Sequence, residues 1–237
     1  MNKQTHYDII GDIHGHHHKL VRLLENLGYQ KRDHSYRHPE GRKVAFLGDL
    51  IDPKGDDPEN PHDVRGVLRL VKGMIDAGEA VAVMGNHEFN AIAFSTPDPA
   101  RPGQFLRPHT ESNQNQIRRS IESMEGGFDG EEWKGWVEWF KELPFFLELD
   151  GLRLVHAYWR DDAVERMKDQ SLRDPDFLLQ ANTKGSPEYN DLEWLLKGLE
   201  IPLPNGQSYL DHTGRPRFKF RAKWFENEPA NKSVPEL

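Results

Sequence analysis

An aspartate and a histidine stand two residues apart in Gly11-Asp12-Ile13-His14-Gly15, directly after the short run Tyr7-Asp8-Ile9-Ile10. The run is typical of a strand, and the glycines allow a sharp turn after it. Residues two apart in an extended segment project to the same side, so Asp12 and His14 can face one metal ion. A carboxylate with an imidazole suits manganese, iron, zinc or nickel. Because such pairs also occur in solvated loops, the interpretation depends on further ligands.

Further candidate ligands follow three more predicted strands. The runs and the residues after them are 43–47 with Gly48-Asp49-Leu50-Ile51-Asp52, 80–84 with Gly85-Asn86-His87-Glu88, and 152–155 with His156. Open α/β sheets place ligands outside the carboxyl ends of their strands. The repeated order of strand and then ligand therefore predicts an α/β fold with a metal site at that edge.

The motifs GDIHG, GDLID and GNHE, in this order, resemble those of the calcineurin-like metallophosphoesterases. Within that superfamily the chain looks most like the bacterial branch of diadenosine tetraphosphatases and related serine/threonine protein phosphatases. The resemblance covers about residues 7–160. It implies a layered fold with central mixed β-sheets flanked by helices. It also implies that two metal ions activate a water that attacks phosphorus in a phosphorylated small molecule, a dinucleoside polyphosphate or another nucleotide, or a phosphoprotein.

The resemblance implies a metal-binding role for five residues. Asp12 and His14 would hold the first ion, and Asp49 would bridge it to the second. Asn86 and His156 would complete the second site. A bridging ligand must offer two oxygens, which a carboxylate has, whereas the neutral oxygen of Asn86 limits the negative charge around an anionic substrate. Manganese is the favoured metal, with iron, zinc and nickel as alternatives.

Two further residues would act on the leaving group. In the family pattern, His87 stands beside the leaving group and is steered by Asp52. An imidazole has a pKa near neutrality, so His87 can donate a proton to a departing alkoxide. The carboxylate of Asp52 would fix the tautomer of that imidazole.

The source of a phosphate-binding cation is open. Many relatives follow the second motif with an arginine that contacts phosphate, whereas this chain continues with Pro53-Lys54. Lys54 is either a replacement cation without the bidentate geometry of arginine, or a solvated loop lysine. Arg160 is either a phosphate clamp or half of a surface ion pair.

The segment from residue 89 to residue 130 has no clear periodicity and several prolines, which predicts an irregular excursion over the active face. It carries four further candidate anion-binding residues, Arg107, His109, Arg118 and Arg119. The aromatic stripe that begins at Trp133 has helical spacing and predicts a core helix.

The remaining elements fit a layered α/β protein. Helices are predicted near residues 16–27 and over 63–77, and each is stopped by a glycine. Within the first, three consecutive histidines from His16 read as a solvated helix start. Asp150-Gly151 between apolar runs predicts a hairpin, and residues 161–200 look largely helical.

The resemblance also implies a last histidine ligand near the end of the chain. Relatives complete the second site with a late Gly-His segment, and His212 is the late histidine of this chain. Asp211 and Gly214 around it are typical of a turn, so we expect the C-terminal strand and its histidine to lie beyond Leu237. On this interpretation residues 1–237 form a single metallophosphoesterase domain that is shortened or divergent. The alternative is that His212 is the ligand.

Composition narrows the classes of protein. No apolar run approaches the length of a membrane span, and the N-terminus lacks the apolar region of a secretion signal. The absence of cysteine excludes disulfides and is compatible with the cytoplasm, which is the expected location. A net charge of -8 argues against broad nucleic-acid affinity. The resemblance also suggests a role in nucleic-acid end healing, as in one related branch, as an alternative function. A further alternative is a binding protein that keeps the fold and one metal or phosphate with little turnover.

Overall fold

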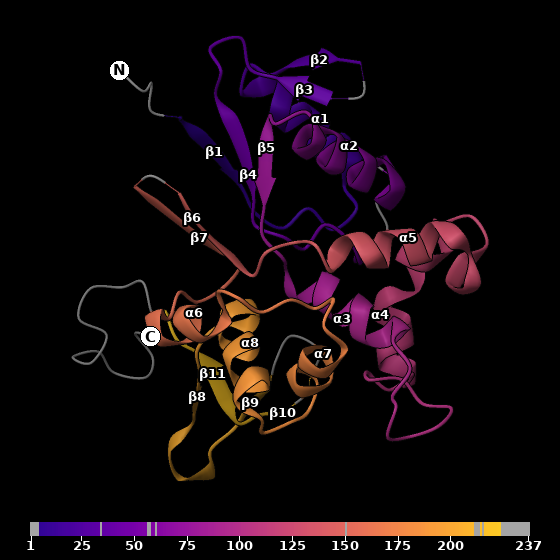
Figure 1. The fold of residues 1–237 in the computed structure, drawn as a ribbon, viewed down its shortest axis with the longest axis vertical. Coiled ribbons are helices and arrows are strands. Elements are labelled where there is room, and N and C mark those ends of the chain that lie inside the picture. The colour runs from indigo at the N-terminus through magenta and orange to yellow at the C-terminus, as the bar shows by residue number, and fades with distance from the viewer. Residues whose placement is uncertain are drawn as a thin grey trace.

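The structure is a computed structural model that describes residues 5–33, 35–55, 58–59, 61–149, 151–210, 214 and 216–223. Its central sheet has three parallel strands in the order β1-β4-β5 (Figure 1). They are β1 (Tyr7–Ile10), β4 (Lys43–Phe46) and β5 (Ala80–Ala82), as the apolar runs predict. Val44, Ala45 and Phe46 of the middle strand are all buried because both faces of the sheet are covered.

Helices α1 (His17–Asn26) and α2 (Val64–Asp76) lie beside the sheet and confirm the two helices predicted in this half (Figure 1). The carboxylate of Asp63 caps α2 by accepting from the backbone N–H of Gly66 at 2.7 Å. Leu24 of α1 and Val67 of α2 are fully buried in one large core with Phe46. The short strands β2 (Gln30–Arg32) and β3 (Ser35–Arg37) form a hairpin beyond them.

The fourth ligand-bearing strand belongs to a different sheet from the first three. Strands β6 (Phe146–Leu149) and β7 (Leu152–Val155) pair antiparallel, which confirms the predicted hairpin, although Asp150 lies outside the described residues. Leu154 packs in a small second core with Ala45 and Val83. Alternation along β4 thus sends Phe46 into the large core and Ala45 toward the hairpin. His156 therefore approaches the site from the opposite layer.

The prediction of an irregular excursion over residues 89–130 was wrong in part. Two helices occupy much of it, α3 (Asn86–Ser95) and α4 (Glu111–Glu122), followed by a 3₁₀ turn (Gly127–Asp129) and α5 (Glu131–Phe140). Helix α3 is buried almost all round, so its sequence has no amphipathic stripe. Helix α4 is mostly polar and buries Ile117 and Ser120. The predicted core helix is α5, in which Trp133 and Phe140 are buried.

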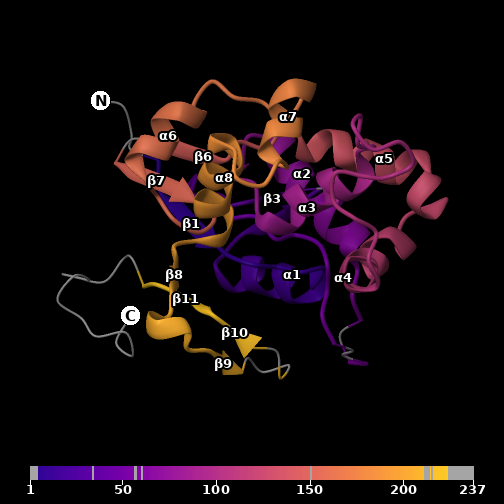
Figure 2. The same cartoon turned by 90° about the horizontal axis from the view of Figure 1, so that it is seen from below.

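The chain after His156 is largely helical up to residue 197, as predicted. Its helices are α6 (Asp161–Met167), α7 (Pro175–Ala181) and α8 (Pro187–Lys197), and α8 lies against the other two (Figure 2). Short strands follow: β8 (Glu200–Pro202), β9 (Tyr209–Leu210), β10 (Pro216–Arg217) and β11 (Lys219–Arg221), with a 3₁₀ turn at Pro204–Gly206. Among the described residues, no helix is both long and apolar enough to cross a membrane.

Candidate metal centre

The loops after β1 and β4 are joined by main-chain hydrogen bonds at Asp49. The carbonyl oxygen of Asp49 accepts from the N–H groups of Ile13 at 3.0 Å and His14 at 2.9 Å. His14, Asp49 and Asp52 have φ angles of 45°, 52° and 61°, in the left-handed region that non-glycine residues avoid. Such strain persists where the surrounding structure imposes it, and it concentrates at functional sites.

The loops after β4 and β5 meet in direct backbone contact. A Cβ atom on Gly48 would lie 2.2 Å from the nitrogen of Gly85, so both positions require glycine. Glu88, fully buried on α3, joins the two loops. Its carboxylate accepts from the N–H groups of Asp49 at 2.8 Å, Leu50 at 2.8 Å and Gly85 at 3.0 Å. Sequence reasoning assigned no role to Glu88, although a glutamate three residues after a helix cap is a capping signal.

Asp49 lies at the centre of the candidate ligands. Its Oδ2 atom is 3.9 Å from Nε2 of His14, 3.8 Å from Nε2 of His87 and 3.6 Å from Nε2 of His156. Its Oδ1 atom accepts from the backbone N–H of His87 at 3.0 Å. Asp12, the most exposed of the set, is 3.8 Å from Nε2 of His14. The structure thus gathers side chains from four separate strand ends around one carboxylate.

The hydrogen bonds of the ring nitrogens leave lone pairs facing this centre. Nδ1 of His14 donates to the carbonyl of Ile51 at 2.8 Å, and Nδ1 of His156 donates to that of Leu47 at 2.5 Å. In each ring Nε2 is then the free acceptor, as in histidines that bind metals. The side-chain amide of Asn86 lies 3.2 Å from Nε2 of His156.

The candidate ligands combine oxygen and imidazole donors. The amide of Asn86 lies among them, because its nitrogen can donate to Nε2 of His156 at 3.2 Å and to the carbonyl of Leu196 at 3.3 Å. The donor set of carboxylates, imidazoles and an amide oxygen therefore fits divalent metal ions.

In the part of the chain that the structure describes, two groups of side chains have metal-binding atoms within 4.8 Å of one another, and both contain Asp49. One is Asp12, Asp49 and His156, and the other is His14, Asp49 and His87. The shared carboxylate matches the expected bridging position. The division of the other residues differs from the family pattern, which pairs Asp12 with His14 and leaves His87 without a metal.

The environment of His87 differs from that of the other two histidines. Its Nδ1 atom bonds the carboxylate of Asp52 at 2.8 Å instead of a backbone carbonyl. Burial disfavours the charged imidazole, but the hydrogen bond with Asp52 and the nearby carboxylates outweigh it and raise the pKa of His87. Burial and the charge of Asp49 raise the pKa of Glu88 to about 7, against the opposing effect of its backbone bonds.

Helix α4 supports the pair of His87 and Asp52. The sequence predicted this pair but not the contribution of α4 to it. The hydroxyl of Ser120 donates to Oδ1 of Asp52 at 2.7 Å and accepts from the N–H of Asp52 at 2.8 Å. Nε2 of Gln116 lies 3.1 Å from Nδ1 of His87. A helix places Gln116 and Ser120 on one face because they are four residues apart. This spacing becomes a signal only once the segment is known to be helical.

The candidate anion-binding residues differ in their surroundings. Arg107 bonds Gln116 at 2.8 Å, and burial lowers the pKa of this guanidinium despite the charge of Asp52. Lys54 is exposed. Arg160 pairs with Asp162 at 2.5 Å and stacks on a tryptophan, so the structure favours the interpretation of this arginine as half of an ion pair.

The remaining candidates are His109 and Arg118 for anion binding and His212 as a metal ligand. His109 lies stacked between Phe94 and Phe105, and Arg118 faces Glu122 at 3.9 Å. His212 lies outside the described residues. A two-residue strand, β9, does precede it, which the sequence did not indicate.

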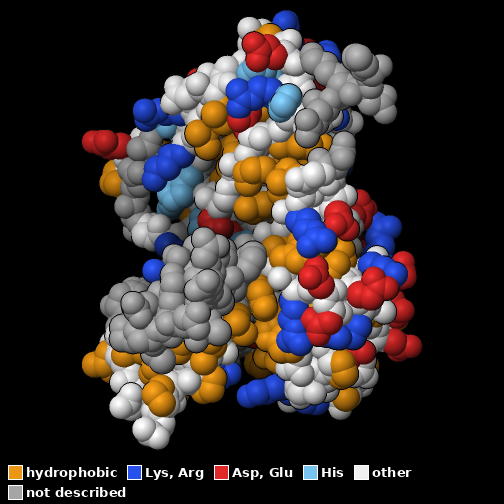
Figure 3. All heavy atoms as spheres, turned by 90° about the vertical axis from the view of Figure 1, so that its left-hand side faces the viewer, with side chains coloured by type: hydrophobic (Ala, Val, Ile, Leu, Met, Phe, Trp, Pro, Cys, Tyr) orange, Lys and Arg blue, Asp and Glu red, His pale blue; other side chains and the backbone are white. Residues whose placement is uncertain are grey.

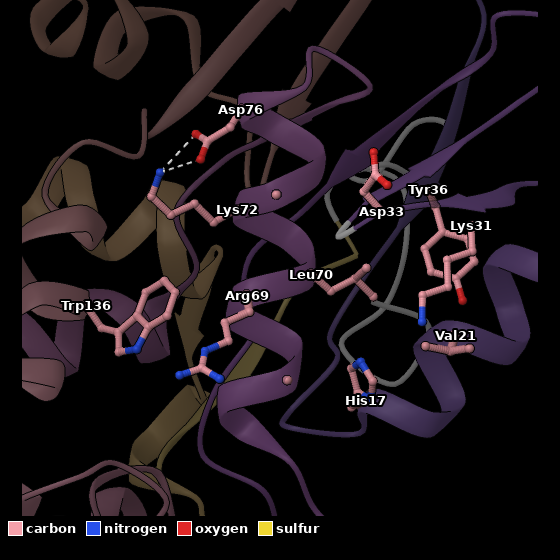
Figure 4. Close-up of a pocket in the computed structure, with 12 residues that line it drawn as sticks. His17, Val21, Lys31, Asp33, Tyr36, Arg69, Leu70, Lys72, Asp76 and Trp136 are labelled. Carbon is pink, nitrogen blue, oxygen red and sulfur yellow. Dashed lines mark hydrogen bonds and ion pairs between the residues drawn. The ribbon is translucent and has the colours of Figure 1, made fainter.

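A separate cavity of about 470 Å³ lies along α2 (Figure 4). His17, Lys31 and Arg69 line it, and Lys72 within it pairs with Asp76 at 2.7 Å. None of the candidate metal ligands is among its lining residues. Figure 3 shows another face of the molecule, on which basic and acidic side chains are interspersed on the lower right and hydrophobic side chains lie along the middle.

Several known proteins are similar in sequence to this chain. It is 40% identical over 230 residues to a bis(5'-nucleosyl)-tetraphosphatase PrpE (asymmetrical) of Bacillus thuringiensis strain Al Hakam, an alignment that covers 87% of this chain and 82% of the relative. A relative of the same name from Halalkalibacterium halodurans is 44% identical over 81 residues, which cover 34% of this chain and 30% of that protein. A cold-active protein-tyrosine phosphatase from a Shewanella species matches with a TM-score of 0.42 at 17% identity, over 81% of this chain and 54% of that one.

The shared region includes the whole cluster around Asp49. A model of the calcineurin-like phosphoesterase family matches residues 6–197, which contain all four strand ends that carry candidate ligands. The chain therefore belongs to the calcineurin-like phosphoesterase family.

Proposed function

We propose that this chain hydrolyses a phosphoester or phosphoanhydride at the cluster around Asp49, with two divalent metal ions as cofactors and manganese as the favoured metal. The observation that carries the proposal is the convergence of three Nε2 atoms on Oδ2 of Asp49 at 3.6 to 3.9 Å. When bound, two such ions would lower the pKa of a water and clamp the attacking and leaving oxygens of an in-line displacement.

The residues that we propose as metal ligands are Asp12, His14, Asp49, Asn86 and His156. The position of Asp49 in both groups of donors supports a bridging role. The contact of 3.8 Å between Asp12 and His14 supports their pairing at one ion, and that of 3.2 Å between Asn86 and His156 supports theirs at the other.

We propose His87 as the proton donor to the leaving oxygen. Its Nδ1–H is held by Asp52, so Nε2 is the atom that would carry the transferred proton. The carboxylates around it favour the protonated ring. Asp52 orients the ring, and Ser120 in turn orients Asp52 through two hydrogen bonds.

We propose a nucleotide with several phosphates as the substrate class. The support is that the relatives are named bis(5'-nucleosyl)-tetraphosphatase, and some of them match over most of their length. The absence of cysteine is compatible with the reducing cytoplasm, where such nucleotides occur and where we place the protein.

Metal-dependent turnover of an aryl phosphate, followed by a panel of phosphomonoesters, phosphopeptides and dinucleoside polyphosphates, tests the proposal. We expect chelation to stop turnover and added manganese to restore it. The Asp49→Asn variant should lose turnover and most metal binding. His87→Ala should retain its metal in calorimetric titration and turn over about 10²–10⁴ times more slowly.

Equal loss of metal in both variants would contradict the separate roles that we assign to Asp49 and His87. Metal binding by the wild-type chain without turnover of any substrate in the panel would instead support the alternative of a binding protein that keeps the fold.

A further inference from the structure

A cavity of about 340 Å³ opens beside the proposed metal ligands. Asp12 and His156 contribute to its wall, together with the loop after His156 and the end of α8. Arg221 and Lys223, at and just beyond the end of β11, also line it. Two cationic side chains thus share one cavity with two residues of the candidate metal centre.

The fold holds this cationic segment in place. Strand β11 pairs with β8, with Arg221 opposite Glu200, and the N–H of Ala222 donates to the carbonyl of Leu199 at 2.8 Å. Arg221 and Lys223 are exposed and Ala222 between them is buried, and all three residues line the cavity. The pairing with β8 and the bond from Ala222 therefore hold the segment that carries both cations at the cavity wall.

The end of α8 leaves room for the arginine. Gly198 has a φ angle of 91°, and a Cβ atom added there would lie 3.3 Å from Cδ of Arg221. The aliphatic part of the Arg221 side chain therefore lies over the bare backbone of Gly198. That backbone is also part of the cavity wall.

Within the described ranges, no carboxylate forms an ion pair with Arg221 or Lys223. This separates them from Arg160 and Arg166, which pair with Asp162 and Asp191. Two such cations facing a metal centre can receive an anion that extends outward from that centre. Arginine suits the planar recognition of phosphate oxygens, and lysine adds a point charge.

We propose that Arg221 and Lys223 form a subsite for the second and further phosphates of a polyphosphate substrate whose scissile phosphate lies at the metal centre. This inference rests on the proposed function and specifies its substrate class. A single phosphate would reach the metal centre without needing the subsite, whereas a chain of phosphates would engage both cations. The subsite therefore selects for polyphosphates over monoesters.

The test compares an aryl monophosphate with a dinucleoside tetraphosphate, at fixed free manganese, in the wild type and in Arg221→Ala, Lys223→Ala and the double variant. For each single variant we expect the KM for the tetraphosphate to rise about 10-fold relative to the KM for the monophosphate. Direct binding of inorganic triphosphate to the metal-loaded protein, measured by calorimetry, should weaken by a similar factor. Arg221→Lys should recover part of both losses because it keeps the charge.

Lys219→Ala is the matched control. Lys219 lies on the same strand and carries the same charge, but it does not line the cavity. This variant should change neither the KM ratio nor triphosphate binding. An unchanged KM ratio in the double variant, or equal effects of all three alanine variants, would overturn the subsite. Absence of turnover for both substrates in the wild-type protein would instead count against the proposed function.

Discussion

Replacement of Glu88 by alanine should destabilise the protein by far more than the loss of one side-chain contact. The carboxylate is fully buried and accepts from three backbone N–H groups, those of Asp49, Leu50 and Gly85. An unsatisfied buried donor costs about 1–3 kcal/mol. Since water can enter the space that the side chain leaves, we place the total loss at about 3–6 kcal/mol, a large part of the stability of an ordinary domain.

The assay is urea denaturation of the metal-free protein in the presence of a chelator, so that metal binding does not contribute to the measured free energy of unfolding. Glu88→Gln should lie between the wild type and Glu88→Ala. The carbonyl oxygen of a glutamine can replace the oxygen that accepts from Asp49 and Gly85, but the amide nitrogen cannot accept from Leu50. Both variants should lower the urea concentration at the midpoint of unfolding. The dependence of the free energy of unfolding on urea concentration should change little.

Glu122→Ala provides the control, because its side chain is exposed and faces Arg118 at 3.9 Å. Its effect should stay within about 0.5 kcal/mol. A loss of less than about 1 kcal/mol in Glu88→Ala would refute the reasoning, because it would mean that the three backbone groups find other partners when the carboxylate is removed.

Three further predictions concern the site. Ser120→Ala should slow turnover of an aryl phosphate about 10–100-fold with unchanged metal stoichiometry. Ser120→Thr should restore much of the rate because it keeps the hydroxyl that bonds Asp52. Equal rates in the wild type and the alanine variant would exclude the positioning role of Ser120. The pKa of Glu88 is raised from its ordinary value of 4.5 to about 7. Between these two pH values the metal-free folded state holds a proton that the unfolded state has already lost. This contribution to stability therefore falls as the pH rises through that window, and Glu88→Gln should remove it from denaturation curves taken across the window. His212→Ala should leave the calorimetric metal stoichiometry unchanged if His212 is a turn residue, whereas loss of the second metal would make it the last ligand.

Much of the site could be predicted because its residues are tied to local signals. Each candidate ligand follows a short apolar run, and strands end where glycine and polar residues begin. The motifs also fix the order in which the ligands occur. For this reason the sequence predicted that Asp12, Asp49, Asn86 and His156 would come together, and the structure places them in one cluster.

The sequence was less informative about helices α3 and α4. Periodicity identifies a helix by the contrast between a buried and an exposed face, and α3 has almost no exposed face. Helix α4 has few apolar residues, so its buried side was not apparent either. The roles of Gln116 and Ser120 depend on which face of α4 meets Asp52, which no local pattern encodes.

The sequence by itself determined the chemical types at the site, since carboxylates, imidazoles and an amide at strand ends already indicate a metal centre. The tertiary structure decided which partners each of these groups has. His87 forms a hydrogen bond with the carboxylate of Asp52, whereas His14 and His156 form theirs with backbone carbonyls. This difference separates a candidate proton donor from candidate ligands. Such partners come from segments far apart in the chain, and their positions follow from how the layers pack, which is a property of the whole fold and not of any one motif.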